Sequence, residues 1–194
     1  MKKLNDVLVF LLSILGIVFM VKYFISGDIV RALISLCLPV LMFLPKLLQK
    51  KIKINERLKL IYILYVFFLM VLGCIFKLYT TIYYYDSLAH FSFGVGCPII
   101  SFLLLKKFNK YDRSSIFFNV FFLLIVTLGL SVLWEIFEFT NSKIFDADVQ
   151  HVLTTGVTDT MKDIILAFLG SILFSTWYIY KAKTNINGFD EFFE

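Results

Sequence analysis

Residues 116–139 read IFFNVFFLLIVTLGLSVLWEIFEF, an almost unbroken apolar run whose ionisable side chains, Glu135 and Glu138, both come near its end. A helix needs about 20 residues to cross the roughly 30 Å of hydrocarbon in a bilayer, and this run is long enough. The stretch therefore predicts a membrane-spanning helix that carries two carboxylates where it leaves the membrane.

The rest of the chain has the same apolar character. Of its 194 residues, 60% are hydrophobic and 23 are Phe, and the mean hydropathy is +0.86. A soluble domain is closer to half apolar. We therefore predict an all-α polytopic membrane protein, a single integral membrane domain over residues 1–194 built as a bundle of six transmembrane helices. The expected spans are residues 4–25, 29–48, 60–79, 87–105, 116–139 and 160–180.

Two details of the N-terminal half bear on this prediction. The second expected span contains Pro39 and Pro45, so a kink is expected there. The apolar run after Met1 is too long for a signal peptide and is expected to be a retained first helix. The three cysteines lie singly in apolar stretches, so neither a disulfide framework nor a cysteine zinc site is expected. They are Cys37, Cys74 and Cys97.

Positive charge sets the expected orientation, because short cytoplasmic loops carry an excess of Lys and Arg. Cations cluster at both ends of the chain and in the linkers after the second and fourth spans. The opposite side has only Lys22, Arg31, Lys77, Lys143 and Lys162. Both termini should therefore be cytoplasmic. The basic loops indicate membrane lipid, in particular anionic lipid, as a partner, and not nucleic acid.

Six ionisable side chains form pairs at the expected external ends of three spans. The pairs are Asp86 with His90, Glu135 with Glu138, and Asp159 with Asp163. Members of a pair are three or four residues apart, which places them on one helix face. The deeper member of each pair is expected about one turn below the surface, and the outer members form a ring above. The deeper residues are His90, Glu135 and Asp163, and the ring is Asp86, Glu138 and Asp159.

These residue types suit several kinds of chemistry. Carboxylates and an imidazole are ligands for Mg²⁺, Mn²⁺, Ca²⁺, Zn²⁺ or non-haem iron, so all six residues are candidate ligands of a divalent metal ion of unknown identity. A metal-free site would use a carboxylate and histidine as general acid and base, or as a proton relay. His90, Glu135 and Asp163 are the candidate catalytic residues. Lys162 is three residues from Asp159, but its side chain can extend to water, so it need not neutralise the cluster.

Local explanations compete with a shared site. Asp86 and Asp159 are each placed to cap a helix N-terminus, and His90 alone is often a packing residue. The two glutamates are harder to explain locally, because a helix C-terminus is the unfavourable end for anions. His151, in the expected external loop 141–157, is either a solvated loop residue or part of a lid. Small residues are expected to let helices approach closely. They are Gly94, Gly96, Ala167, Gly170 and Ser171.

Three short motifs carry a resemblance to a known family. They are Asp86-x-x-x-His90-Phe91 with Gly94, Trp134-Glu135-x-x-Glu138, and Asp159-x-x-x-Asp163 followed by Gly170. In these motifs the chain resembles small bacterial membrane proteins of the YjdF type and, more weakly, VanZ-like proteins. The VanZ-like pattern has a lysine where this chain has Ser87 and a glutamine in place of Glu138. The resemblance implies a multi-pass protein of the bacterial inner membrane and marks the same polar positions.

Three function hypotheses follow. The leading one is a metal-dependent enzyme, such as a hydrolase, that acts on a lipid or lipid-linked substrate at the outer leaflet. The second is a proton or cation transporter that uses the same carboxylates, but few polar groups continue along the fourth and sixth spans beyond Ser92, Ser101, Ser171, Ser175 and Thr176. The third is a structural or immunity protein. The motifs of CAAX-type proteases, phosphatidic acid-type lipid phosphatases and di-iron bundles are absent from the sequence.

Overall fold

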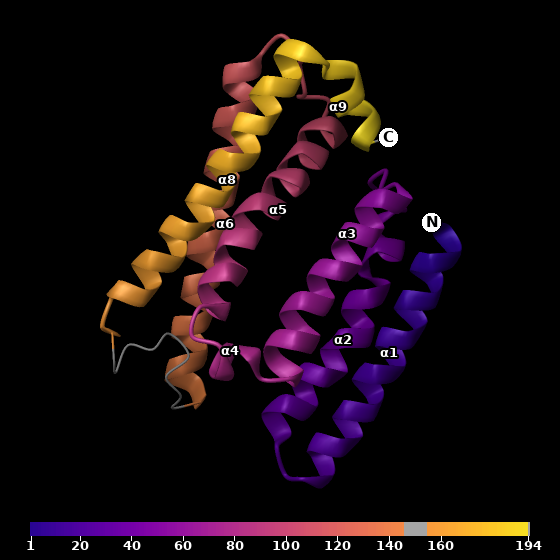
Figure 1. The fold of residues 1–194 in the computed structure, drawn as a ribbon, viewed down its shortest axis with the longest axis vertical. Helices are drawn as coiled ribbons and strands as arrows, with labels where there is room; N and C mark the ends of the chain where they lie inside the picture. The colour runs from indigo at the N-terminus through magenta and orange to yellow at the C-terminus, as the bar shows by residue number, and fades with distance from the viewer. Residues whose placement is uncertain (146–154, 194) are drawn as a thin grey trace. The chain divides into compact units, whose positions relative to one another are not determined.

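The computed structural model describes residues 1–145 and 155–193, and its regular elements in these ranges are helices (Figure 1). Six helical segments are long and apolar enough to cross a membrane. They are α1 (Lys2–Ile25), α2 (Ile29–Leu48), α3 (Glu56–Val66) continued by the π-helix η1 (Phe67–Ile75), α5 (Tyr85–Lys107), α6 (Ile116–Phe145) and α8 (Thr158–Thr184). Two short helices, α4 (Leu78–Thr81) and α9 (Ile186–Phe193), complete the described part. The expected all-α fold with six apolar helices is confirmed, and the chain is a multi-pass membrane protein.

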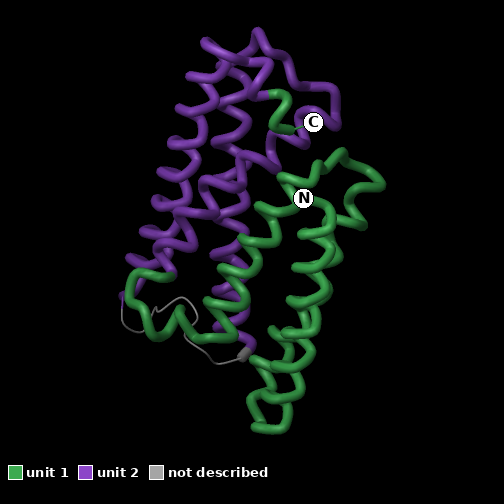
Figure 2. Tube along the Cα trace, turned by 45° about the vertical axis from the view of Figure 1, so that its right-hand side comes forward, with its two compact units in different colours: residues 1–85, 190–194 green, residues 86–189 purple. Residues whose placement is uncertain are grey.

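The chain divides into two compact units, coloured separately in Figure 2. Unit 1 comprises residues 1–85 and 190–194, and unit 2 comprises residues 86–189. All six residues of the predicted site belong to unit 2. The helices α5, α6 and α8 supply them, so unit 2 decides the geometry of the site.

In unit 1, α1 and α2 pack as a hairpin. Gly27 has a positive φ of 78° in the turn, and the side chain of Asp28 caps α2 by accepting a hydrogen bond from the Arg31 amide. Gly16 lets the helices approach, since a Cβ there would lie 2.9 Å from Pro39 Cδ. The helix α2 continues through Pro39 and Pro45. Tyr23 links the hairpin to the third span by donating a 2.7 Å hydrogen bond to the Ile75 carbonyl.

The third span begins and ends earlier than its hydropathy predicts. The side chain of Asn55 caps α3 by accepting a hydrogen bond from the Leu58 amide, so the helix starts at Glu56 rather than at residue 60. At the other end, η1 stops at Ile75, and Lys77 follows with a left-handed φ of 65°. A capping side chain and a backbone reversal therefore set the limits of this span, and hydropathy detects neither.

In unit 2, α5 and α8 meet backbone against backbone. A Cβ on Gly94 would collide with the Ala167 carbonyl, and one on Gly170 would collide with the Phe91 carbonyl. Small residues are needed wherever transmembrane helices come this close. Gly96 does not share this role, because a Cβ on it would meet no described atom within 4 Å. The expectation of close approach therefore holds for Gly94, Ala167 and Gly170, and it is wrong for Gly96.

The helix α6 packs along α8 in the opposite direction, and Figure 1 shows the two side by side. At one end, Asn119 donates a 2.8 Å hydrogen bond to the hydroxyl of the fully buried Tyr178. At the other end, α6 continues to Phe145 and does not stop near residue 139. Glu135 and Glu138 therefore lie well inside the helix. The unfavourable end of the helix dipole, which acts only within the last turn, does not apply to them.

The glycine contacts predict different outcomes for two similar substitutions in α5. Gly94→Ala should destabilise the protein by about 1–3 kcal/mol, because overpacking a tight contact costs this much. Gly96→Ala is the matched control, and it should be neutral or stabilise by up to about 1 kcal/mol through helix propensity. Denaturation of the two purified variants in detergent measures the difference. Equal stabilities would contradict the close approach of α5 and α8.

Candidate functional site

Asp86 and His90 lie one turn apart in the first part of α5. Their spacing stacks them on one face of the helix, and His90 Nε2 lies 3.6 Å from Asp86 Oδ1. His90 is only 7% exposed, whereas Asp86 is half-buried. The pair thus runs from a partly accessible carboxylate to a buried imidazole.

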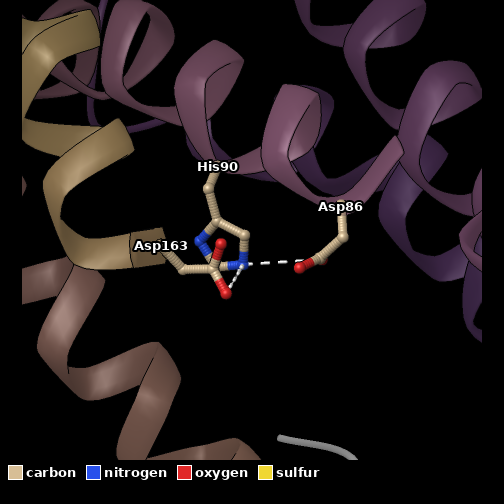
Figure 3. Close-up of side chains that lie close together, drawn as sticks. All are labelled: Asp86, His90 and Asp163. Atoms are coloured by element: carbon tan, nitrogen blue, oxygen red, sulfur yellow. Dashed lines mark ion pairs between the residues drawn. The ribbon is translucent and has the colours of Figure 1, made fainter. Parts of the chain in front are cut away.

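Asp163 reaches the same imidazole from α8. Its Oδ2 lies 3.9 Å from His90 Nε2, and the residue is 2% exposed. Figure 3 shows Nε2 facing both carboxylates, one from each helix. One ligand atom each from Asp86, His90 and Asp163 can be chosen so that all three lie within 4.8 Å of one another. We refer to these three residues as the triad.

The spacing within the triad follows from the packing of α5 and α8. Gly94 and Ala167 touch, and His90 and Asp163 each lie one turn earlier on the same two helices. The equal offset means that α5 and α8 run in the same direction. A close backbone contact therefore brings the two buried side chains together.

The distances within the triad are too long for hydrogen bonds. Both separations from Nε2 exceed the usual limit of about 3.2 Å between donor and acceptor. Within the described ranges, Asp163 Oδ1 is buried and accepts no hydrogen bond. The triad therefore consists of polar atoms that converge without bonding directly to each other.

Lys162 contacts two carboxylates of the site while its side chain stays partly exposed. Its Nζ donates a 2.5 Å hydrogen bond to Asp159 Oδ1 and lies 3.8 Å from Asp163 Oδ1. The side chain is 43% exposed, so it reaches the carboxylates from the solvent-accessible side. The spacing of three residues between Asp159 and Lys162 was the signal in the sequence for this pair.

The two glutamates of α6 lie beside the triad. Glu135 is buried, and Glu138 is half-buried and accepts a 2.8 Å hydrogen bond from Trp134 Nε1. Glu138 is within electrostatic range of Glu135, Asp86 and Asp159. Glu135 is also within electrostatic range of Asp163. The spacing of four residues between Trp134 and Glu138 places both on one helix face, which allows this hydrogen bond.

Unit 2 thus brings the predicted residues into one region but not into one ligand shell. Asp86, His90 and Asp163 form the triad, and Glu135, Glu138 and Asp159 interact with it electrostatically. The three residues expected to lie deeper are all buried, and the other three are half-buried. His151 lies outside the described residues, so both expectations for it, a solvated loop residue or part of a lid, stay predictions.

The donor set of the triad is one imidazole nitrogen and carboxylate oxygens. Such a set suits Mn²⁺, Fe²⁺ or Zn²⁺, with Mg²⁺ and Ca²⁺ preferring oxygen alone. Without a cation, the same groups can exchange protons. Both uses require the ionisable side chains to stay close together in an otherwise apolar helix bundle.

Comparisons with known proteins place the chain in a family. Residues 7–184 match the family described as predicted membrane protein (DUF2238). An uncharacterized protein of Thermotoga maritima is 35% identical over 137 residues, which cover 68% of this chain and 66% of that protein. No solved structure matches. The match is consistent with the YjdF-type resemblance, whereas the VanZ-like resemblance stays a prediction. The chain belongs to the DUF2238 family of predicted membrane proteins.

Proposed function

We propose that this protein of the bacterial inner membrane binds one divalent metal ion between Asp86, His90 and Asp163, at the external side of the bilayer. The observation that carries the proposal is the convergence of three ligand atoms within 4.8 Å of one another, from two different helices. Two of the three residues are almost fully buried, so the ligands are held by packing.

The distances between the ligand atoms fit a bound cation better than direct bonding. Ligands about 2.1 Å from a metal are separated from each other by about 3–4 Å, and the triad has separations of 3.6 and 3.9 Å. A pair that bonds directly would lie closer. A small movement of the three side chains would bring all three ligand atoms to coordination distance from one metal ion.

The surrounding charge also favours a cation. Asp86, Asp163, Glu135, Glu138 and Asp159 are five carboxylates, and Lys162 is the ammonium that the structure places among them. Carboxylates gathered in an apolar setting repel one another unless positive charge offsets them. A divalent ion at the triad would supply that charge where the carboxylates are deepest.

The reaction proposed for this site is hydrolysis of a lipid or lipid-linked substrate. When bound, the metal supplies a Lewis acid and an activated water. Glu135 is buried and interacts electrostatically with Asp163, and in this proposal it takes up or returns a proton. Asp86 and Glu138 are half-buried and form the side of the site nearer to solvent.

Metal binding gives the first test of this proposal. The purified protein should bind one Mn²⁺ or Zn²⁺, and His90→Ala or Asp163→Asn should weaken that binding at least about 100-fold, because even outer-shell changes cost 10–100-fold. Asp112→Asn is the matched control, since Asp112 is an exposed carboxylate at the other end of unit 2. Calorimetric titration measures the affinity. Equal binding by all variants would rule out the triad as the site.

The free energy of unfolding distinguishes a metal-binding site from a polar cluster that only holds the helices together. Without metal, Asp163→Asn should leave stability unchanged or raise it by about 1–3 kcal/mol, because it removes a buried carboxylate that lacks a hydrogen bond on Oδ1. With metal at 100 times the wild-type dissociation constant, wild type should gain about 2.7 kcal/mol and the variant, which binds at least about 100-fold more weakly, at most about 0.4 kcal/mol. Thermal unfolding in detergent with and without chelator gives both values. A destabilised metal-free variant would favour the structural role.

The variant Glu135→Gln tests the proposed hydrolytic activity. This variant should keep its metal but turn over membrane lipid about 10²–10⁴-fold more slowly, since it loses a proton-transfer group. Mass spectrometry of lipid extracts incubated with the metal-loaded protein measures the product. If wild type changes no lipid under conditions where metal is bound, the enzymatic proposal fails while the metal site stands.

A further inference from the structure

Unit 1 contains a pocket of about 260 Å³ that has no residue in common with the triad. Its lining comes from the first turns of α2, from the end of η1 and from the turn that leads into α4. The helix η1 packs against both α2 and α4, so these three elements hold the pocket in shape. Its lining includes the ionisable residues Asp28, Arg31 and Lys77 and the apolar residues Val30 and Ile34.

Arg31 is held in place by the residue that caps its own helix. Asp28 Oδ1 accepts a 3.1 Å hydrogen bond from the Arg31 amide, and Asp28 Oδ2 forms a salt bridge with Arg31 Nη1. A guanidinium has five N–H donors, and within the described residues its bond to Asp28 uses only Nη1. Asp28 therefore orients the guanidinium and leaves most of its donors available to a ligand.

Lys77 adds a second cation to the pocket. Its backbone has a left-handed φ of 65°, and its carbonyl accepts hydrogen bonds of 3.0 and 3.1 Å from the hydroxyls of Thr80 and Thr81. Its side chain is exposed and makes no hydrogen bond or ion pair within residues 1–145 and 155–193. Since Asp28 is the carboxylate in the lining and already pairs with Arg31, the charge of Lys77 is not offset.

Positive charge is uncommon on the side of the membrane where this pocket is expected. Lys22, Arg31 and Lys77 are three of the five cations that the orientation rule places on the external side. Lys22 Nζ and Arg31 Cζ each lie 5.8 Å from the centre of the Tyr23 ring, so Lys22 is close to the pocket as well. Like charges gathered in this way repel one another, and a bound anion would offset them.

We propose that this pocket binds a phosphate group through Arg31 and Lys77. A guanidinium fits phosphate oxygens with its planar fork of donors, and a lysine ammonium binds phosphate as a point charge. A phospholipid headgroup and a free phosphate ion share this chemistry. Val30 and Ile34 in the same lining would contact the apolar part of a lipid. The proposal goes beyond the metal site and does not rest on it.

Titration of the purified full-length protein in detergent tests the proposal. The probes are short-chain phosphatidylglycerol, diacylglycerol with the same chains, and inorganic phosphate, each followed by calorimetry. Lys77→Gln should weaken binding of the phosphate-bearing probe about 10-fold, because it removes a charge-assisted hydrogen bond. Its fold should be preserved, since the Lys77 side chain has no bonded partner in the described structure. Lys143→Gln is the matched control, because Lys143 is an exposed lysine outside both the pocket and the triad.

The three probes distinguish the source of the phosphate from the failure of the proposal. Binding of phosphatidylglycerol that Lys77→Gln weakens and Lys143→Gln does not supports a lipid headgroup, and the same pattern with inorganic phosphate supports a free ion. The proposal is overturned if neither probe binds, if Lys77→Gln binds like wild type, or if diacylglycerol binds as tightly as phosphatidylglycerol. Metal titration of Lys77→Gln should give wild-type affinity, so failure of this pocket is distinct from failure of the metal site.

Discussion

The backbone contact between α5 and α8 determines the geometry of the site. Gly94 and Gly170 have no side chain to hold the helices apart, and each lies against a carbonyl of the opposite helix. His90 lies one turn before Gly94, and Asp163 lies one turn before Ala167, which Gly94 contacts, so these two side chains must share one space. A single methyl group at Gly94 would move α8 and increase the distance between the imidazole and the carboxylate. The chemistry proposed for the triad therefore depends on residues that carry no chemistry themselves.

Burying charged groups in an apolar bundle is energetically unfavourable, and local contacts within unit 2 stabilise some of these groups. Asp86 and Asp159 lie in the first turns of α5 and α8, where the helix dipole favours anions. Lys162 bonds to Asp159, and Trp134 donates to Glu138. These contacts stabilise the half-buried carboxylates. Asp163 Oδ1 accepts no hydrogen bond within the described residues, and this deeper carboxylate is where a bound cation would contribute most.

The sequence predicted the helices well and the contacts between them less well. Apolar length was enough to identify six spans, and spacings of three and four residues were enough to pair the ionisable side chains. The choice of Asp86 as the third member of the triad depends on how each helix is rotated, which hydropathy does not encode. The sequence does not reveal that Thr127 and Ser131 on α6 are buried, because single hydroxyls barely change the hydropathy of an apolar helix. Asn55 set the start of the third span through a local cap that the apolar pattern does not reveal.

The coordination of a bound ion tests the central claim most directly. Electron spin echo spectroscopy of the protein loaded with Mn²⁺ detects an imidazole nitrogen bonded to the metal. We predict the signal of one such nitrogen in wild type and its loss in His90→Ala, with Asp112→Asn giving the wild-type spectrum. A spectrum of fully hydrated Mn²⁺ in wild type, without nitrogen coupling, would contradict a metal site at the meeting point of α5 and α8.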